Sequence, residues 1–499
     1  MSITIRLRDN RFGKNALSFR QEGATDSFIS KDACNEGLGD RKISGPQRDL
    51  LAKFGNLSLA ELSERANGAL IDLSCSHFEK ENRNEQPFFK FHEDEKRDSS
   101  FHLDTGNLMG VLRFRDKEKA SVQVEVLSRF DKGENNFFLN YLLSKVFNFA
   151  LGAESVSAER SSLLNLLLDI VFVRRLGEAS KAGLLRHYRE FRNNDWHFKG
   201  SLDLTRHIRE NVPLMHGIAY RKREIDLDVP VNRMILKAAL AVNRRHPVFF
   251  EENRDAADAL RQLRMGVTEE RNLGTLLSCR DCREPVSHPF FREVWEPLRQ
   301  IARMILEDEQ WTLFSKESPE AEVSGIVFDG SWLWEEYVAK VLEAVGFKHC
   351  TERILRVFDN GAKRFKPDFF LENDNPSKRI VLDAKYKRSS PNGDRHDVHQ
   401  VLCYLLLTGA KKGGLVFPPA DAKCETGDVE CYGEPQRGGW SASRTIADSV
   451  KNYGLSIEWS CFSWAPIQNV PWVSWGDFCN YMEEQETNCR EMDSDPNVG

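Results

Sequence analysis

The segment Lys366 to Lys387, KPDFFLENDNPSKRIVLDAKYK, places charges inside runs that otherwise suit buried strands. Two apolar runs, KPDFFLE and RIVLDAKYK, flank the polar stretch NDNPSK, whose Asn, Asp and Pro favour a turn. This pattern predicts a β-hairpin. Asp368, Asp383 and Lys385 then lie within its strands, where an uncompensated charge is costly.

Side chains alternate along a strand, so Asp383 and Lys385 share one face, and the hairpin brings Asp368 close to Asp383. Two facing carboxylates repel each other, and a divalent cation removes that repulsion. Mg²⁺, with Mn²⁺ as an alternative, suits two carboxylates and a backbone carbonyl such as that of Ala384. Lys385 would orient or help to deprotonate a metal-activated water and offset charge on a phosphate. These residues therefore predict metal-dependent phosphodiester hydrolysis.

The order Pro367-Asp368, then Asp383-Ala384-Lys385, resembles the PD-(D/E)xK nuclease superfamily. The resemblance implies a restriction-endonuclease-like domain, a mixed sheet flanked by helices, in which these residues form the catalytic centre. The alternative for so short a motif is a solvent-facing hairpin with an Asp/Lys pair.

Two neighbouring elements extend the resemblance. Glu335, in the helical segment WLWEEYV, stands where the superfamily often supplies a third acidic group, which implies a metal ligand; Glu336 is its rival. Gln400 and Tyr404 match the QxxxY element of RecB-like members. Their four-residue spacing places both on one helix face, where they would touch the DNA backbone or orient the metal site.

The whole chain, 499 residues, is too long for one core and is predicted to be a multidomain α/β protein. Period-two alternation in GVLRFRD and ASVQVEVLSRF closes a β-rich N-terminal module, residues 1–130. Apolar residues at three- and four-residue spacing predict a helical middle domain, residues 131–320, that ends in the linker SKESPEAEVSG. Residues 321–499 would form the nuclease domain, read as a helix, three strands, a helix and a further strand.

Composition limits the cellular setting. The longest strongly apolar stretch, LLNLLLDIVFV, is too short to span a bilayer, and the first residues lack a signal-peptide core, so we expect a cytoplasmic protein without membrane contact. The cysteines show no disulfide-framework spacing. Cys279 and Cys282 form a CxxC pair, but with His288 as the nearest further ligand the set stays one short of a zinc site.

The net charge of -6 means that any nucleic-acid surface is local. Basic residues concentrate in the middle of the chain, interleaved with Tyr188 and Trp196, and would neutralise phosphates or stack on bases. A partner surface or a solvated face that supports the fold are the alternatives. The basic residues are Arg186, Arg189, Arg192, Lys199, Arg206, Arg209, Arg221, Lys222 and Arg223.

A second resemblance covers about Gly110 to Gly414. The hairpin GVLRFRDKEKASVQVEVL, a G-x-L-D-x-x-x-H-I-R-x-N segment within residues 200–211 and an E-x-x-x-D-x-P-x-N-R segment within residues 224–233 resemble restriction subunits of the McrC type. Ser128-Arg129 stands where that family usually has a Pro-Lys pair.

This resemblance implies the nuclease subunit of a type IV-like, anti-phage restriction system. Its partners would be DNA and an McrB-like AAA+ GTPase or ATPase hexamer, with dimerisation through the nuclease domain as one way to cut both strands. The sequence agrees independently on one point, because it contains no GxxxxGK[ST] phosphate loop and so cannot supply a P-loop motor. A stand-alone RecB-like nuclease, or mainly a scaffold that activates a partner NTPase, are the alternatives.

Overall fold

Contacts divide the chain into two compact units: Met1–Leu164 together with Ser318–Gly499, and Asn165–Glu317. The sequence of the second unit is therefore inserted within that of the first. The domain boundaries expected from the sequence, at 130/131 and 320/321, remain a prediction. The computed structural model describes residues 2–22, 27–30, 42–66, 70–74, 84–93, 100–116, 120–131, 136–149, 151, 163–213, 217–286, 289–313, 323–350, 355–356, 364–387, 394–419, 439–440, 444–445, 458–463 and 474–490. Within these ranges, no helix combines the length and the apolar character needed to cross a bilayer.

The first sheet of unit 1 contains the predicted hairpin, β8 paired antiparallel with β9. β1 joins β9 in parallel, and β13, which follows the inserted unit in the sequence, joins β8. A Cβ on Gly110 would lie 2.1 Å from the carbonyl oxygen of Ile326, and one on Gly325 would lie 2.0 Å from that of Val111, so glycine is needed for this close pairing. The order is β1 (Ser2–Arg8), β9 (Ser121–Leu127), β8 (Leu108–Arg115), β13 (Val323–Asp329) and β5 (Leu70–Asp72).

A second five-stranded sheet completes the β-rich N-terminal part. Buried phenylalanines form its core, where Phe101 stacks on Phe19 and on Phe91. Its order is β4 (Lys42–Ser44), β3 (Ser27–Ser30), β2 (Leu17–Gln21), β7 (Ser100–Thr105) and β6 (Phe89–Glu93). The accompanying helices are η1 (Gly13–Asn15), α1 (Gly45–Phe54) and α2 (Leu59–Ala66).

Unit 2 contains the helices that the apolar spacing predicts, with α8 packed against α9, α10 and α13. They are α6 (Leu163–Ala182), α8 (Pro230–Arg245), α9 (Pro247–Glu252), α10 (Arg254–Gly266), α11 (Leu273–Ser278), α12 (Arg280–Arg283) and α13 (Pro289–Leu313). A three-stranded sheet, which the helical prediction for this region did not include, interrupts these helices in the sequence. Its strands are largely exposed on both faces and thus lack the apolar alternation that reveals half-buried strands.

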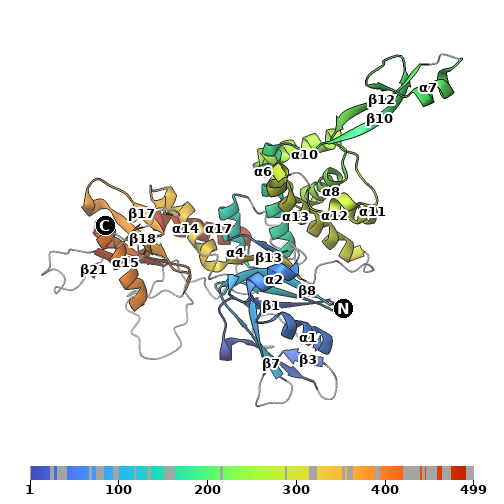
Figure 1. The fold of residues 1–499 in the computed structure, drawn as a ribbon. Helices are drawn as coiled ribbons and strands as arrows, with labels where there is room; N and C mark the ends of the chain where they lie inside the picture. The colour runs from blue at the N-terminus through green and yellow to red at the C-terminus, as the bar shows by residue number, and fades with distance from the viewer. Residues whose placement is uncertain are drawn as a thin grey trace. The chain divides into compact units, whose positions relative to one another are not determined.

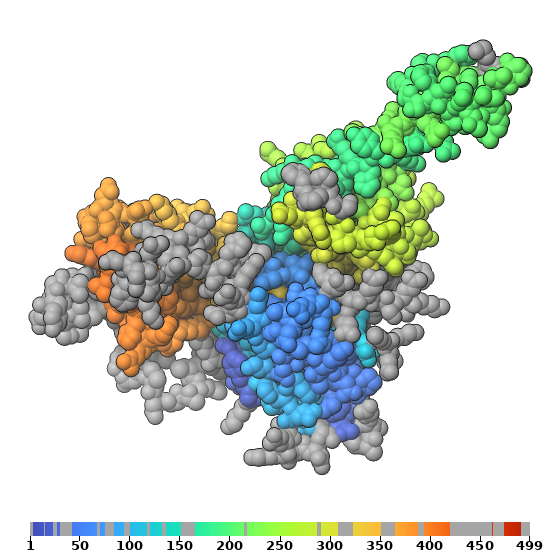
Figure 2. Space-filling model, in the orientation of Figure 1, coloured from blue at the N-terminus to red at the C-terminus, as the bar shows by residue number. Residues whose placement is uncertain are grey.

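We call this sheet and its helix the arm. It consists of β10 (His187–Asp195), β11 (Ser201–Leu202), α7 (Leu204–Asn211) and β12 (Ile218–Asp226). It projects as a long hairpin from the helices of its unit (Figure 1), and its atoms stand clear of them (Figure 2).

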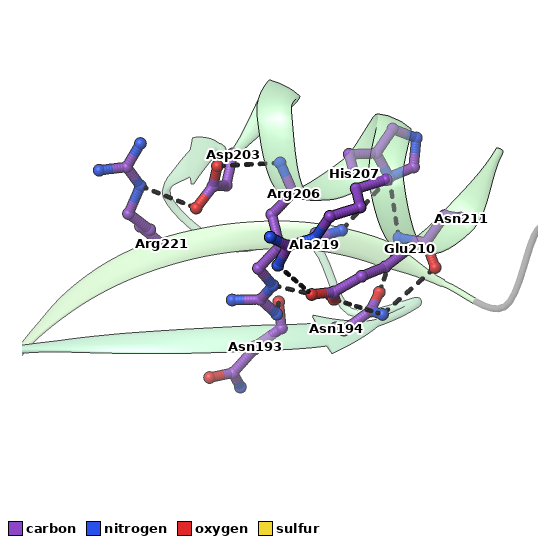
Figure 3. Close-up of polar contacts among 10 residues, drawn as sticks. Asn193, Asn194, Asp203, Arg206, His207, Glu210, Asn211, Ala219 and Arg221 are labelled. Carbon is purple, nitrogen blue, oxygen red and sulfur yellow. Dashed lines mark hydrogen bonds and ion pairs between the residues drawn. The ribbon is translucent and has the colours of Figure 1, made fainter.

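Polar side chains fix the helix of the arm on its strands (Figure 3). Asp203 accepts a hydrogen bond from the amide of Arg206 and lies 3.2 Å from Arg221. Asn211 pairs with Asn194 and also contacts His207. Asp203, His207 and Asn211 of the G-x-L-D-x-x-x-H-I-R-x-N segment therefore have a structural role, because they hold the helix against the strands.

The C-terminal part of unit 1 is a mixed sheet. β17 and β18 are antiparallel, whereas β18, β19 and β22 run in parallel. The order is β14 (Lys348–His349), β17 (Phe369–Leu371), β18 (Ile380–Ala384), β19 (Lys412–Phe417), β22 (Glu458–Ser463) and β20 (Gly439–Trp440), and β21 (Arg444–Thr445) also pairs with β22. β15 (Leu355–Arg356) and β16 (Arg364–Phe365) form a separate pair, and η2 (Pro376–Lys378) lies in the predicted turn.

Helices pack on this sheet through buried apolar side chains. α15 (Arg395–Thr408) contacts β18 and β19, and α14 (Gly330–Glu343) contacts β18. α4 (Phe137–Phe147) and α17 (Trp475–Arg490) pack against α14. The hydroxyls of Tyr141 and Tyr337 both donate to the buried carboxylate of Glu486, at 2.8 and 3.0 Å, which joins three helices from distant parts of the sequence.

Candidate active site

The predicted hairpin forms with the register that its alternation implies. Phe369 of β17 pairs with Leu382 of β18, so Asp368 precedes the pairing next to Asp383. The amide of Ala384 donates to Asp368 Oδ2 at 2.7 Å. Asp368 and Asp383 are thus neighbours on adjacent strands, at the end of β18 where the strand leaves the sheet.

Lys385 follows β18 directly and turns back toward Asp383. Its Nζ lies 2.6 Å from Asp383 Oδ2 and donates to Gln400 Oε1 at 2.9 Å. The backbone amide of Lys385 donates to the carbonyl of Val416 in β19, which fixes the start of the side chain. The ammonium is therefore held between the predicted acidic pair and α15.

Gln400 and Tyr404 lie one turn apart on α15 and connect the two ends of the hairpin. Gln400 accepts from Lys385, so its amide nitrogen faces the Tyr404 hydroxyl at 2.6 Å. Tyr404 donates in turn to the carbonyl of Lys366 at 2.7 Å. Tyr404 is only 1% exposed, and its environment raises the pKa of the phenol, mainly through burial, so it stays a protonated donor inside the fold. The hydrogen bonds of this pair thus connect Lys385 with the backbone of Lys366.

Glu335 reaches the site from α14. Asp329 begins that helix by accepting a hydrogen bond from the amide of Ser331. Glu335 Oε1 lies 2.8 Å from Nε2 of His349, which belongs to β14. The charge of Glu335 helps to raise the pKa values of Asp368 and Asp383, so Glu335 is the member of the Glu335/Glu336 pair that faces the site.

Burial and like charges act together on the acidic pair. Burial raises the pKa of Asp368 well above its usual range, and the charges of Asp383 and Glu335 add to that effect. Burial also raises the pKa of Asp383, although the ammonium of Lys385 opposes it. For Lys385, burial disfavours the charge, but the nearby charges of Asp383, Asp368 and Asp397 and the hydrogen bond to Asp383 together outweigh burial, and the pKa is raised. The site therefore gathers three carboxyl groups, those of Asp368, Asp383 and Glu335, near one lysine, and their ionisation is mutually unfavourable unless further positive charge is bound.

These residues fit a hard divalent cation. Asp383 is 1% exposed, and its buried Oδ2 has the Lys385 ammonium, at 2.6 Å, on one side only, which leaves a second lone pair for a ligand. The carboxylates of Asp368 and Asp383 come from adjacent strands, as for an ion that takes two carboxylates and keeps several waters. Ala384 supplies a nearby backbone carbonyl, and Glu335 supplies further negative charge.

The sequence did not reveal two neighbours of the site. Asp397, buried in the first turn of α15, lies 3.9 Å from Lys385 Nζ and 2.5 Å from Lys387 Nζ. Its place three residues before Gln400, on the same helix face, is the signal that could have found it. His349 is separated from Glu335 by fourteen residues, and no spacing rule links them.

Two other metal candidates lie outside this site. Among the described residues, the one set of three ligands within 4.8 Å of one another is His92, His102 and Asp104, on β6 and β7. The two imidazoles stack at 19° between their planes, and His92 Nε2 lies 3.5 Å from Asp104 Oδ2. Burial raises the pKa of Cys282 to about 12, which disfavours the thiolate that zinc needs, and His288 lies outside the described residues.

Comparison with known families decides the broader relationship. The family described as "McrBC 5-methylcytosine restriction system component" matches residues 103–418, more than half of the chain. The chain belongs to this family. The match includes the β8–β9 hairpin, the arm and every residue of the candidate site, whereas residues 1–102 and 419–499 of this McrBC-family chain lie outside it.

Two solved structures resemble the McrBC-family chain. One is a half-complex from a tetradecameric assembly of Thermococcus gammatolerans McrB AAA+ hexamers with bound McrC, at 13% identity and a TM-score of 0.46, covering 96% of this chain and 99% of that chain. The other is the McrBC complex of Thermococcus gammatolerans, at 14% identity and a TM-score of 0.30, covering 68% of this chain and 88% of that chain. No curated protein matches the chain significantly.

Proposed function

We propose that this McrBC-family chain is the metal-dependent DNA endonuclease subunit of its restriction system, with a PD-(D/E)xK type of nuclease domain. The observation that carries the proposal is the placement of Asp368 and Asp383 on paired strands with Lys385 2.6 Å from Asp383. Burying three ionisable side chains next to one another costs free energy and does not help the chain to fold. Metal-dependent phosphodiester hydrolysis, in contrast, uses such a group of side chains.

The chemistry follows from this arrangement. Asp368, Asp383, Glu335 and the carbonyl of Ala384 would hold Mg²⁺ or Mn²⁺, which would supply an acidified water and stabilise charge on the phosphate. Because the Lys385 pKa is raised, its ammonium stays charged and acts as a hydrogen-bond donor. It orients the attacking water and stabilises the negative charge that develops on the phosphate oxygens.

The arm supports a role in docking on the AAA+ partner. It concentrates large apolar side chains that no core covers, and the most exposed of them is Tyr188 at 74%. Exposed apolar side chains gathered on one small substructure are typical of protein contacts. Its members are Tyr188, Trp196, Phe198, Leu202, Leu204, Ile208, Val212 and Ile225.

The charges of the arm favour a protein over DNA as its partner. Most of its basic side chains pair with acidic neighbours, which removes much of the positive field that phosphate binding needs. These pairs are Arg189 with Asp226, Arg192 with Glu190, Arg206 and Arg209 with Glu210, Arg221 with Asp203 and Lys222 with Glu224. Activation of a partner NTPase through the arm is therefore a second candidate function that coexists with cleavage.

The test is cleavage of plasmid DNA, with and without 5-methylcytosine, by the purified chain in Mg²⁺, in the presence and absence of its AAA+ partner and nucleotide. We expect cleavage that depends on the partner and on nucleotide, that is absent in Asp383→Asn, and that leaves stimulation of the NTPase intact in that variant. Cutting that needs no partner would establish a stand-alone nuclease. Absence of cutting under every condition, with NTPase stimulation retained, would leave the scaffold function.

A further inference from the structure

The Ser128-Arg129 pair at the end of β9 has no part in the chemistry above, yet it contacts the residue that follows Lys385. The Ser128 hydroxyl lies 2.8 Å from that of Tyr386. The guanidinium of Arg129 donates to the backbone carbonyl of Tyr386 and lies over its ring, 5.0 Å from the centroid. Phe130 meets the same ring edge-on, also at 5.0 Å. Three consecutive residues thus hold the hydroxyl, the ring and the carbonyl of Tyr386.

The clamped residue controls how the chain leaves β18. Before it, the amide of Lys385 is bonded to Val416, and after it the amide of Lys387 donates to the carbonyl of Lys385 at 3.0 Å. Tyr386, which is only 6% exposed, follows Lys385 directly, so contacts that fix Tyr386 also restrain the backbone from which the Lys385 side chain extends.

The ring of Tyr386 also rests on the first residue of the helix that carries Glu335. A Cβ on Gly330 would lie 2.8 Å from the ring, so only glycine permits this contact. The Tyr386 hydroxyl additionally contacts Met109 Sδ in β8, at 3.7 Å. Tyr386 therefore stands between the N-terminal sheet, the catalytic strand and α14.

Arg129 is itself held by the end of β1. Its amide donates to Asp9 Oδ1 at 2.5 Å, and its guanidinium lies 3.6 Å from Asp9 Oδ2. Arg8 donates to the carbonyl of Ser128 at 3.0 Å. Because β1 and β9 are paired in parallel, with Arg8 opposite Leu127, the two strand ends form one buried platform for the clamp.

We propose that Ser128 and Arg129 are positioning residues that hold Lys385 in register with Asp383 by clamping Tyr386. The proposal rests on the proposed nuclease function and makes cleavage depend on the N-terminal sheet. A serine hydroxyl and a planar guanidinium are the two groups that bind Tyr386 here.

The first test compares Ser128→Ala and Tyr386→Phe with the wild type in the full-length chain with its NTPase partner. Each change removes one hydroxyl of the 2.8 Å pair and no charge. Ser128→Ala also removes the acceptor of the Phe130 amide, at 3.2 Å, and Tyr386→Phe also removes the contact with Met109 Sδ. We expect each to lower kcat for plasmid cleavage about tenfold with KM for DNA unchanged, and the double variant to lower it by much less than the hundredfold product, because the contact between the two hydroxyls is lost in both single variants. A loss of fold alone would not produce this non-additive effect on kcat.

Two matched controls separate positioning from general packing. Ser121→Ala removes a buried serine at the opposite end of β9, and Tyr141→Phe removes a buried tyrosine hydroxyl that is bonded to Glu486. Both should keep the wild-type kcat. A loss as large in the controls as in Ser128→Ala would overturn the proposal.

A second measurement does not depend on cleavage. In Arg129→Lys, which keeps a charge beside Asp9 but loses the planar contact with Tyr386, the amides of Lys385 and Lys387 should exchange with solvent about tenfold faster than in the wild type. Unchanged exchange at both amides would refute the clamp. If the wild type does not cleave DNA at all, the nuclease proposal fails and the exchange result alone decides the clamp. If Asp383→Asn abolishes cleavage while Ser128→Ala and Tyr386→Phe cut normally, the clamp fails and the nuclease proposal stands.

Discussion

The buried carboxyl of Asp9 should make the stability of the folded chain depend on pH. Asp9 is fully buried, and burial raises its pKa from 3.8 to about 6, although Arg129 opposes the shift. The folded chain therefore keeps this proton to a higher pH than the unfolded chain. Stability falls as pH rises from about 4 to about 6, and the total loss is about 3 kcal/mol, from 2.2 pKa units at 1.36 kcal/mol each. Asp9→Asn cannot ionise and keeps the Oδ1 that accepts from Arg129, so it should lose this dependence.

The assay is thermal unfolding of the full chain at pH values from 4 to 8, followed for the transition of unit 1. Between pH 4 and pH 7, the melting temperature of the wild type should fall by about 5 °C more than that of Asp9→Asn. Asp374→Asn, which removes an exposed carboxylate from the hairpin turn, is the control and should follow the wild type. Parallel curves for Asp9→Asn and the wild type would refute the reasoning.

Three further predictions concern the site and the arm. Gln400→Ala should lower kcat for cleavage by about tenfold to a hundredfold, because it removes the hydrogen bonds to both Lys385 and Tyr404. His399→Ala, on the exposed face of the same helix, should cut at the wild-type rate, and circular dichroism checks that both variants fold. Mg²⁺ at a hundredfold excess over its Kd should add about 2.7 kcal/mol of stability to the wild type and none to Asp383→Asn, and equal melting shifts would argue against a metal at Asp383. Ile208→Ser on the arm should weaken binding to the AAA+ partner at least about tenfold in a titration, whereas Met265→Ser, equally apolar and 83% exposed but outside the arm, should bind normally.

Local sequence was sufficient to predict the hairpin of the candidate site. The two apolar runs and the turn residues between them predict the strand pair, and the alternation of side chains along a strand puts Asp383 and Lys385 on one face. The structure contains this pair, with Asp368 next to Asp383. The helix spacing of Gln400 and Tyr404 likewise placed both on the face that meets Lys385.

The missed features depend on contacts between distant segments or on exposed strands. β13 pairs with β8 although a whole unit separates them in the sequence, and nothing in VSGIVFD indicates its partner. The strands of the arm were not predicted, because the strands of an exposed hairpin need no apolar face. Residues 187–226 therefore show neither the two-residue apolar period of a strand nor the 3.6-residue period of a helix. The contact of Arg129 with Tyr386 spans 257 residues and joins two modules that the sequence presents as separate.

The most direct test of the central claim compares two lysines that lie two residues apart. Lys385 contacts Asp383 and Gln400 in the site, whereas Lys387 pairs with Asp394 and Asp397 beside it. We would measure cleavage of methylated plasmid DNA in Mg²⁺, with partner and nucleotide, by Lys385→Met and Lys387→Met. The account predicts that Lys385→Met abolishes cleavage and that Lys387→Met retains most of it. Cleavage by Lys385→Met at the wild-type rate would contradict the assignment of this site as the catalytic centre.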